Sequence, residues 1–432
     1  MTSKRYTGNI ITDTPTDPTG DAAGGVWSLA EINEYKSANA WPTLPEAPTV
    51  GTATAGIDGV ATVAFTAPEL YGGTVSQYTA TSSPSSITGT GTTSPITVSG
   101  LTNGASYTFT VKATTGAGTG PESASSNSVS PQAGDRGVIA GGYAGGSINA
   151  NTNVIEYITI NSAGNATDFG DLTAANQMSS GGMSSSTRGM FAHSSFSNIV
   201  DYVTIASTGN ATDFGNQRYS YQLRACSSNS TRGLVAGGNR SGQSYSNEID
   251  YFTIASTGNY TNFGTLDVPR YGLTSCSSTT RALFAGGYTG STSNVIDYVT
   301  IATTSYATDF GDLFNDGIDS GKKVYFGACS SNTRGVFMGG NSNSIGGRTM
   351  SYVTISTTGN SSDFGDLIAY TQYNSGTSNK VTGLSIGGYV GGVHSDQIQQ
   401  ITIASTGNAS DFGDLTTETY YVGSVSDSHG GL

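Results

Sequence analysis

The sequence predicts an all-β protein in which a β-sandwich precedes six copies of one four-stranded unit. Three observations support this fold class. From residue 136 a pattern recurs every roughly 45–54 residues, the behaviour of stacked supersecondary units with a common core. Residues 45–132 alternate apolar and polar side chains between turn-forming residues. The 61 glycines and the 35% share of hydrophobic residues suit many short strands joined by tight turns.

Residues 1–43 are expected to form an anchor with one short helix. Ser28 and Glu31 match the S-x-x-E capping box, and the apolar periodicity that follows predicts a helix over roughly 29–37. Large apolar side chains in or beside this helix are Trp27, Leu29, Ile32, Tyr35 and Trp41. So short a helix cannot bury them alone. They either pack on the next domain or dock the protein onto a larger assembly, and we favour docking.

Residues 44–132 are expected to form the β-sandwich. Expected strands cover residues 60–65, 76–81, 96–101, 107–113 and 123–129. The segment LTNGASYTFTVKA places Tyr107, Phe109, Val111 and Ala113 on one inward face. This stretch resembles a fibronectin type III domain, and Tyr107 matches the tyrosine-corner region of such sandwiches. We interpret the domain as a spacer.

Each repeat within residues 133–432 predicts four strands. An inner strand turns at Thr-Arg into a second strand ending in Gly-Gly, a variable loop leads to a third strand with a tyrosine, and a Gly-Asn turn leads to a fourth strand with a phenylalanine. These features resemble the kelch repeat, which implies a six-bladed β-propeller. No inner strand precedes Arg136, so we expect the C-terminal TYYVGSVSDS segment to complete the first repeat and close the ring.

Composition excludes several functions. The net charge of −13 argues against a nucleic-acid partner. No apolar run suits membrane insertion, and the N-terminus lacks a signal-peptide core, which favours synthesis in a cytoplasm. The three histidines, His193, His394 and His429, form no ligand motif, so we expect neither a metal site nor a cofactor. The cysteines, which we assign to one position of the repeat, are interpreted as packing residues: Cys226, Cys276 and Cys329.

Two sequence patterns raise chemical alternatives to a purely structural role, a sialidase-like site and a Ca²⁺ site. Asp168-Phe169-Gly170 and its copies resemble part of the Asp-box of six-bladed sialidases, but the pattern lacks its terminal tryptophan. The arginines recur at one turn of successive repeats, which favours a structural role over carboxylate recognition. Paired acids such as Asp168 and Asp171 can bind Ca²⁺ or cap turns, and turn capping is favoured. We therefore expect no catalytic residues.

The variable loops after Gly-Gly remain as candidates for recognition. Aromatic and amide side chains in or near them are the candidate ligand-binding residues: Tyr143, Asn239, Tyr245, Tyr288, Asn341 and Tyr389. Such side chains suit contacts with carbohydrate or protein.

The segment GGVWSLAEINEYKSANAWP resembles leader segments of tailed-bacteriophage virion proteins. The resemblance implies a non-enzymatic virion structural protein on the capsid or tail, as a fibre or head decoration protein and a homo-oligomer on the particle. Residues 1–43 would contact other virion proteins, and the propeller would bind a host-surface glycan or protein. The alternatives are a purely architectural connector and a sialidase-like or other carbohydrate-active enzyme.

Overall fold

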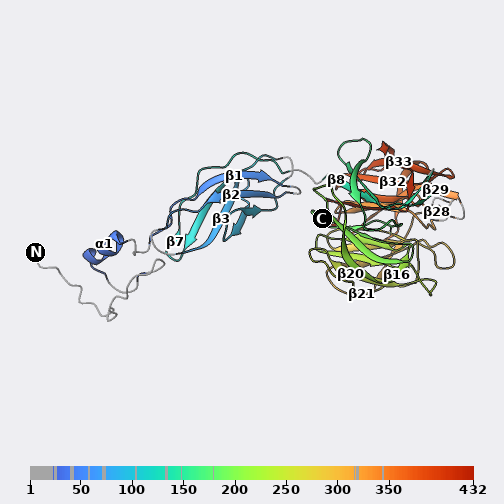
Figure 1. Cartoon of the computed structure of the whole chain (residues 1–432), viewed down its shortest axis with the longest axis horizontal. Coiled ribbons are helices and arrows are strands. Elements are labelled where there is room, and N and C mark those ends of the chain that lie inside the picture. Colours follow the sequence, from blue (N-terminus) through green and yellow to red (C-terminus); the bar gives the residue numbers. More distant parts are fainter. Residues whose placement is uncertain are drawn as a thin grey trace, which may run out of the picture. The chain divides into compact units, whose positions relative to one another are not determined.

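The computed structural model describes residues 23, 27–38, 43–56, 59–70, 74–102, 105–131, 135–146, 148–178, 180–315, 317, 321–342 and 345–432. The chain divides into two compact units, Met1–Ala133 and Gly134–Leu432. Strands predominate in both units, and the described residues contain a single helix (Figure 1). The all-β prediction is therefore confirmed. The one helix of the described ranges is too short to cross a membrane.

Helix α1 (Leu29–Ser37) begins and ends where the sequence predicts. The Ser28 hydroxyl accepts the Glu31 N–H at 3.3 Å, and the Glu31 carboxylate accepts the Ser28 N–H at 2.7 Å, which completes the capping box. These bonds lower the pKa of Glu31. No residue of α1 is buried. Trp27 packs edge-on against Tyr35, Leu29 is exposed, and Trp41 lies outside the described residues.

The first unit contains a β-sandwich. One sheet has the order β1-β2-β5 and the other the order β4-β3-β6-β7. Their bounds are β1 (Thr49–Ala55), β2 (Ala61–Thr66), β3 (Val75–Ser83), β4 (Thr88–Gly91), β5 (Ile96–Val98), β6 (Thr108–Thr115) and β7 (Gly118–Thr119). Alternate residues of β2, β3 and β6 point into a shared core with Phe109 and Val111 at its centre. The Tyr107 hydroxyl accepts the Thr102 N–H at 3.0 Å, as a tyrosine corner requires.

The expected strand over residues 123–129 does not form as a regular strand. Its backbone follows β6, but only every third N–H bonds to that strand, from Ser123, Ser126 and Val129. The hydroxyls of Ser123 and Ser126 accept the N–H groups of Val111 and Phe109 in place of backbone carbonyls. Serine side chains thus compete with the ladder, which periodicity alone does not reveal.

The second unit contains six repeats, numbered 1 to 6 along the chain, and each has four antiparallel strands in the expected order. The inner strands are β36 (Gly423–Ser426), β13 (Met183–Ser184), β17 (Ala225–Ser228), β22 (Thr274–Ser277), β26 (Gly327–Ser330) and β31 (Ser375–Ser378). The second strands are β8 (Arg136–Ala140), β14 (Arg188–Ala192), β18 (Arg232–Ala236), β23 (Arg281–Ala285), β27 (Arg334–Met338) and β32 (Thr382–Val390).

The third strands are β11 (Val154–Thr159), β15 (Ser197–Thr204), β20 (Glu248–Thr253), β24 (Val295–Thr300), β29 (Ile345–Thr354) and β33 (Val393–Thr402). The fourth strands are β12 (Thr167–Asp171), β16 (Thr212–Gln222), β21 (Thr261–Thr265), β25 (Thr308–Asp312), β30 (Ser362–Gln372) and β34 (Ser410–Asp414). Short strands in the connections are β9 (Tyr143–Ala144), β10 (Ala150–Asn151), β19 (Asn239–Arg240), β28 (Asn341–Ser342) and β35 (Thr419–Tyr420).

The C-terminal strand β36 supplies the inner strand of repeat 1. It pairs antiparallel with β8, with Gly423 opposite Ala140 and Ser426 opposite Gly137. Repeat 1 therefore joins segments from the two ends of the unit.

The repeated arginines connect neighbouring repeats. Each guanidinium lies over the third-strand tyrosine of its own repeat, 4.2 to 4.5 Å from the ring centre, and donates to an isoleucine carbonyl of the next repeat at 2.6 to 3.1 Å. The five residues are Arg136, Arg188, Arg232, Arg281 and Arg334. The guanidinium thus stacks on a tyrosine ring and donates a hydrogen bond within the protein itself. A structural role therefore explains why this arginine recurs.

The Gly-Asn turns also join neighbours. In five repeats the asparagine Oδ1 accepts a backbone N–H from the fourth strand of the preceding repeat at 3.0 to 3.1 Å. The glycine that follows the fourth-strand phenylalanine of each repeat allows this approach. A Cβ on Gly413, for example, would lie 2.4 Å from the Gly164 carbonyl oxygen. The need for glycine at this position becomes clear only from the close approach of the neighbouring repeat.

Candidate functional site

A cluster of tyrosines covers the connections that lead into the inner strands. Tyr325, Tyr373 and Tyr421 each stand two residues before an inner strand, with φ of 61°, 60° and 56°. The Tyr325 and Tyr373 ring centres are 4.7 Å apart, and Tyr373 and Tyr421 are also 4.7 Å apart. A tyrosine in the left-handed region is uncommon and strained. The same left-handed conformation occurs two residues before the inner strands of repeats 2, 3 and 4, at Gly181, Leu223 and Gly272, so the turn belongs to the repeat and the tyrosine side chains distinguish repeats 5, 6 and 1.

More aromatic rings extend the cluster to both sides. On one side Tyr420 lies 5.0 Å from Tyr421 and 5.3 Å from Tyr143, and His394 stacks on Tyr420 at 5.0 Å. On the other side Tyr271 lies 6.2 Å from Tyr325. The remaining members contact these rings and are Tyr245, Tyr288 and Tyr389. We call all ten residues the tyrosine cluster.

The chemistry of the cluster is that of neutral, partly exposed phenols. All nine tyrosines are half-buried, so each residue is partly exposed to solvent. Burial raises the pKa of Tyr325, Tyr373, Tyr420 and Tyr421, which keeps these hydroxyls protonated at physiological pH. Aromatic faces with neutral hydroxyls bind apolar ring faces and polar edges together. A small cavity among Tyr325, Tyr373 and Tyr421 has about 20 Å³ of free space, so a larger ligand would lie on the cluster, outside this cavity.

The structure brings four of the six predicted ligand-binding residues into this cluster: Tyr143, Tyr245, Tyr288 and Tyr389. Asn239 lies in β19, where it pairs with Gln222, and Asn341 lies in β28. Neither asparagine has a ring to contribute. The tyrosines before the inner strands, and His394, were missed as site residues. A signal existed, because Tyr recurs two residues before the inner strands of repeats 5, 6 and 1, but only the register of the inner strands makes it visible.

Six serines connect the inner strands. Each hydroxyl donates to the backbone carbonyl of the equivalent serine in an adjacent inner strand, at 2.5 to 3.1 Å. The order of donation is Ser184, Ser426, Ser378, Ser330, Ser277, Ser228 and again Ser184. A cavity that all six serines line has about 50 Å³ of free space, enough for a few waters but not for a sugar. We assign these serines a structural role.

His429 lies at this cavity. Its Nε2 is 3.2 Å from the Ser228 hydroxyl, and its Nδ1 accepts the Gly431 N–H at 3.0 Å. Burial lowers the pKa of His429 to about 4, so the imidazole is neutral and serves as a packing and hydrogen-bonding group.

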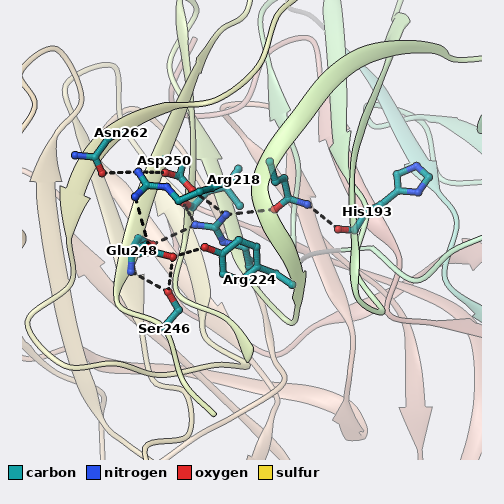
Figure 2. Close-up of polar contacts among 10 residues, drawn as sticks. His193, Arg218, Arg224, Ser246, Glu248, Asp250 and Asn262 are labelled. Atoms are coloured by element: carbon teal, nitrogen blue, oxygen red, sulfur yellow. Dashed lines mark hydrogen bonds and ion pairs between the residues drawn. The ribbon is translucent and has the colours of Figure 1, made fainter. Parts of the chain in front are cut away.

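Charged side chains form a second polar group where β16 of repeat 2 meets β20 of repeat 3 (Figure 2). Arg224 and Asp250 are both fully buried and 3.2 Å apart, and Arg218 lies 2.9 Å from the other Asp250 oxygen. Glu248 accepts hydrogen bonds from Ser246 and Tyr221 and lies 3.5 Å from Arg218. Arg224 thus binds a carboxylate of its own repeat, whereas Arg218, in β16 of repeat 2, binds carboxylates of repeat 3.

The same group tests the carbohydrate-active-enzyme alternative, because it pairs a tyrosine with a glutamate beside arginines. Tyr221 is fully buried, and burial raises its pKa. A phenol nucleophile needs access to substrate and a lowered pKa. Tyr221 has neither property, so it is unsuited to act as the nucleophile of a glycosidase.

The cysteines are buried, as the sequence predicts, but one of them does not share the repeat position that the sequence analysis assigned to all three. All three are buried thiols outside any disulfide. Cys276 and Cys329 face Leu283 and Val336 at equivalent register positions, whereas Cys226 faces Val235, one residue out of step. Ser227 therefore occupies the shared position in repeat 3. In the described residues no group of three or more His, Cys, Asp or Glu could hold a metal ion.

Comparison with known proteins identifies the class of one part of the chain. Residues 46–129 match the family model of the fibronectin type III domain, which agrees with the sandwich and with the sequence prediction. Among curated proteins, none matches the sequence.

Proposed function

We propose that the six repeats form a closed kelch-like β-propeller. Three contacts between the N-terminal and C-terminal ends of the repeat unit support closure. Strand β36 pairs with β8, the Asp414 N–H donates to Asn165 at 3.1 Å, and the Thr416 N–H donates to Glu156 at 2.8 Å. The serine series, which returns to its first residue, supports it as well. Each repeat would be one blade, and the inner strands would surround the axis.

We further propose that the protein is a non-enzymatic adhesion protein that binds a glycan without anionic groups through the tyrosine cluster. The carrying observation is the continuous contact among aromatic rings from several repeats. Sugar rings stack their apolar faces on such rings, and the hydroxyls bond to phenols. The net charge of −13 and the neutral phenols disfavour anionic sugars.

Alanine at the centre of the cluster should weaken glycan binding. Tyr373 contacts Tyr325, Tyr420 and Tyr421, so Tyr373→Ala removes a stacking face and loosens its neighbours. We expect affinity to fall about tenfold or more, in line with ~1 kcal/mol or more for each lost aromatic contact. Glycan-array screening of the full chain, followed by calorimetry with the best ligand, measures this.

Tyr306→Ala is the matched control, because Tyr306 is 77% exposed. It also lies outside the tyrosine cluster. Its binding should equal that of the unchanged protein. A blank glycan array and no binding to whole bacterial cells would overturn adhesion and leave an architectural connector between virion proteins as the function.

We propose that the protein is located on a phage capsid or tail, with residues 1–43 as its attachment segment. In support, α1 leaves Leu29 exposed and Ile32 and Tyr35 only half-buried, so its apolar face has room for a partner. Deletion of residues 1–43 should prevent incorporation into particles while glycan binding is retained. Particle sedimentation followed by immunoblotting measures incorporation; particles that still carry the shortened protein contradict the attachment role.

A further inference from the structure

The third strand of every repeat carries one buried position directly before its tyrosine or the equivalent residue. The six residues are Glu156, Asp201, Asp250, Asp297, Ser351 and Gln399. Four are carboxylates, and each lies within a packed repeat where an isolated charge is costly. The partner of each carboxylate therefore decides what the position does.

Three of the four carboxylates have an arginine or histidine side chain within ion-pair distance. His193 lies 2.9 Å from Asp201, Arg224 lies 3.2 Å from Asp250, and Arg270 lies 3.0 Å from Asp297. The other two repeats have the neutral residues Ser351 and Gln399.

Repeat 1 alone has a carboxylate at this position without a cation in the described part of the chain. Glu156 is 6% exposed, and its hydrogen-bond partner is Thr416, whose N–H lies 2.8 Å from Oε1. Burial, and then the nearby charge of Asp168, raise the pKa of this carboxyl.

The places that supply the cation in the other repeats are occupied by small or uncharged residues in repeat 1. By register, Gly141 stands where repeat 2 has His193, Val422 stands where repeat 3 has Arg224, and Thr419 stands where repeat 4 has Arg270. All three line a cavity together with Glu156. A missing internal cation has thus left a space beside a buried carboxylate.

The cavity has the size and lining for a small cation. Its free space of about 30 Å³ exceeds the ~10–15 Å³ that one water needs, so it can hold an ammonium group. Threonine hydroxyls lie around it, and Ile148 and Val154, 53% and 37% exposed, form an apolar rim at the surface. Thr419 is followed in the chain by Tyr420 of the tyrosine cluster, so the cavity lies beside the proposed glycan surface.

We propose that the cavity beside Glu156 binds a primary ammonium group. The ammonium would donate to Glu156 and to a threonine hydroxyl, replacing the arginine or histidine of the other repeats. Building on the proposed function, the ligand is an amino sugar with a free amine, whose ring extends over the apolar rim toward Tyr420. A single carboxylate with hydroxyls suits an ammonium better than a divalent metal, which takes several oxygen ligands.

Calorimetry on the full chain with ethylammonium, glucosamine and N-acetylglucosamine tests the proposal. Ethylammonium and glucosamine should bind and N-acetylglucosamine should bind about tenfold more weakly or not at all, because acetylation removes the charge. Glu156→Gln should weaken glucosamine binding about tenfold or more. Gln suits the position structurally, because Gln399 already occupies it in repeat 6 and accepts the Ile368 N–H at 2.8 Å.

Two further variants give the result its specificity. Thr419→Arg should supply an internal guanidinium and abolish ammonium binding, whereas Glu418→Gln, which removes an exposed neighbouring carboxylate, should change nothing. The proposal is overturned if ethylammonium and glucosamine both fail to bind, if Glu156→Gln binds as well as the unchanged protein, or if Ca²⁺ binds there and ammonium does not. A blank glycan array with intact ethylammonium binding would instead contradict only the adhesion function.

Discussion

Removal of residues 416–432 should abolish cooperative folding of the repeat unit. The deletion removes β35, β36 and the Thr416 bond to Glu156. Strand β8 would then expose an unpaired edge and the apolar side chains of Val138 and Ile139, both buried in the intact chain. The serine series would also lose Ser426, so Ser184 would have no acceptor. We expect loss of the unfolding transition of this unit, measured by tyrosine circular dichroism during heating.

A peptide spanning residues 416–432, added to the truncated chain, is the matched control. If β36 acts by completing repeat 1, the peptide should restore the transition in a concentration-dependent way. A peptide with Val425→Asp, which places a charge at a position 3% exposed, should fail to do so. An unchanged transition after truncation would contradict the closed propeller.

The fold was predictable from sequence where pattern and physics coincide within a repeat. Tyr157 and Phe169 show this well, because their constant separation reflects one hairpin, and the structure pairs β11 with β12. The capping box at Ser28 is another local rule that held. Residues 123–129 were misjudged because the hydroxyls of Ser123 and Ser126 replace ladder carbonyls, a choice that alternation of apolar residues does not encode.

The site was less predictable, because it depends on contacts between repeats. Tyr143 and Tyr389 could be selected from their loops, yet Tyr325 and Tyr373 enter the cluster through a backbone turn before the next inner strand. The lack of an arginine or histidine beside Glu156 was equally hard to predict from the sequence. It appears only when Gly141, Thr419 and Val422, which come from both ends of the unit, are seen to line one cavity.

Substitution of Asp250 should be far more destabilising than substitution of its partner Arg224. Asp250→Ala leaves the fully buried Arg224 guanidinium without a carboxylate, and removal of one partner of a buried ion pair costs roughly 3–5 kcal/mol. We expect about 3 kcal/mol, the lower end, since Arg224 keeps the carbonyls of Val235 and Glu248 as acceptors. Equilibrium unfolding of the full chain in urea measures the difference.

Arg224→Met gives the opposite limit and separates an ion-pair effect from general loss of packing. Asp250 would still bind Arg218 at 2.9 Å, so the expected loss in the free energy of unfolding is about 1–2 kcal/mol. The double variant Arg224→Met/Asp250→Leu removes both buried charges and should be more stable than Asp250→Ala alone. If the double variant is instead the least stable of the three, shape rather than charge governs this position, and the ion-pair comparison that singles out Glu156 loses its energetic basis.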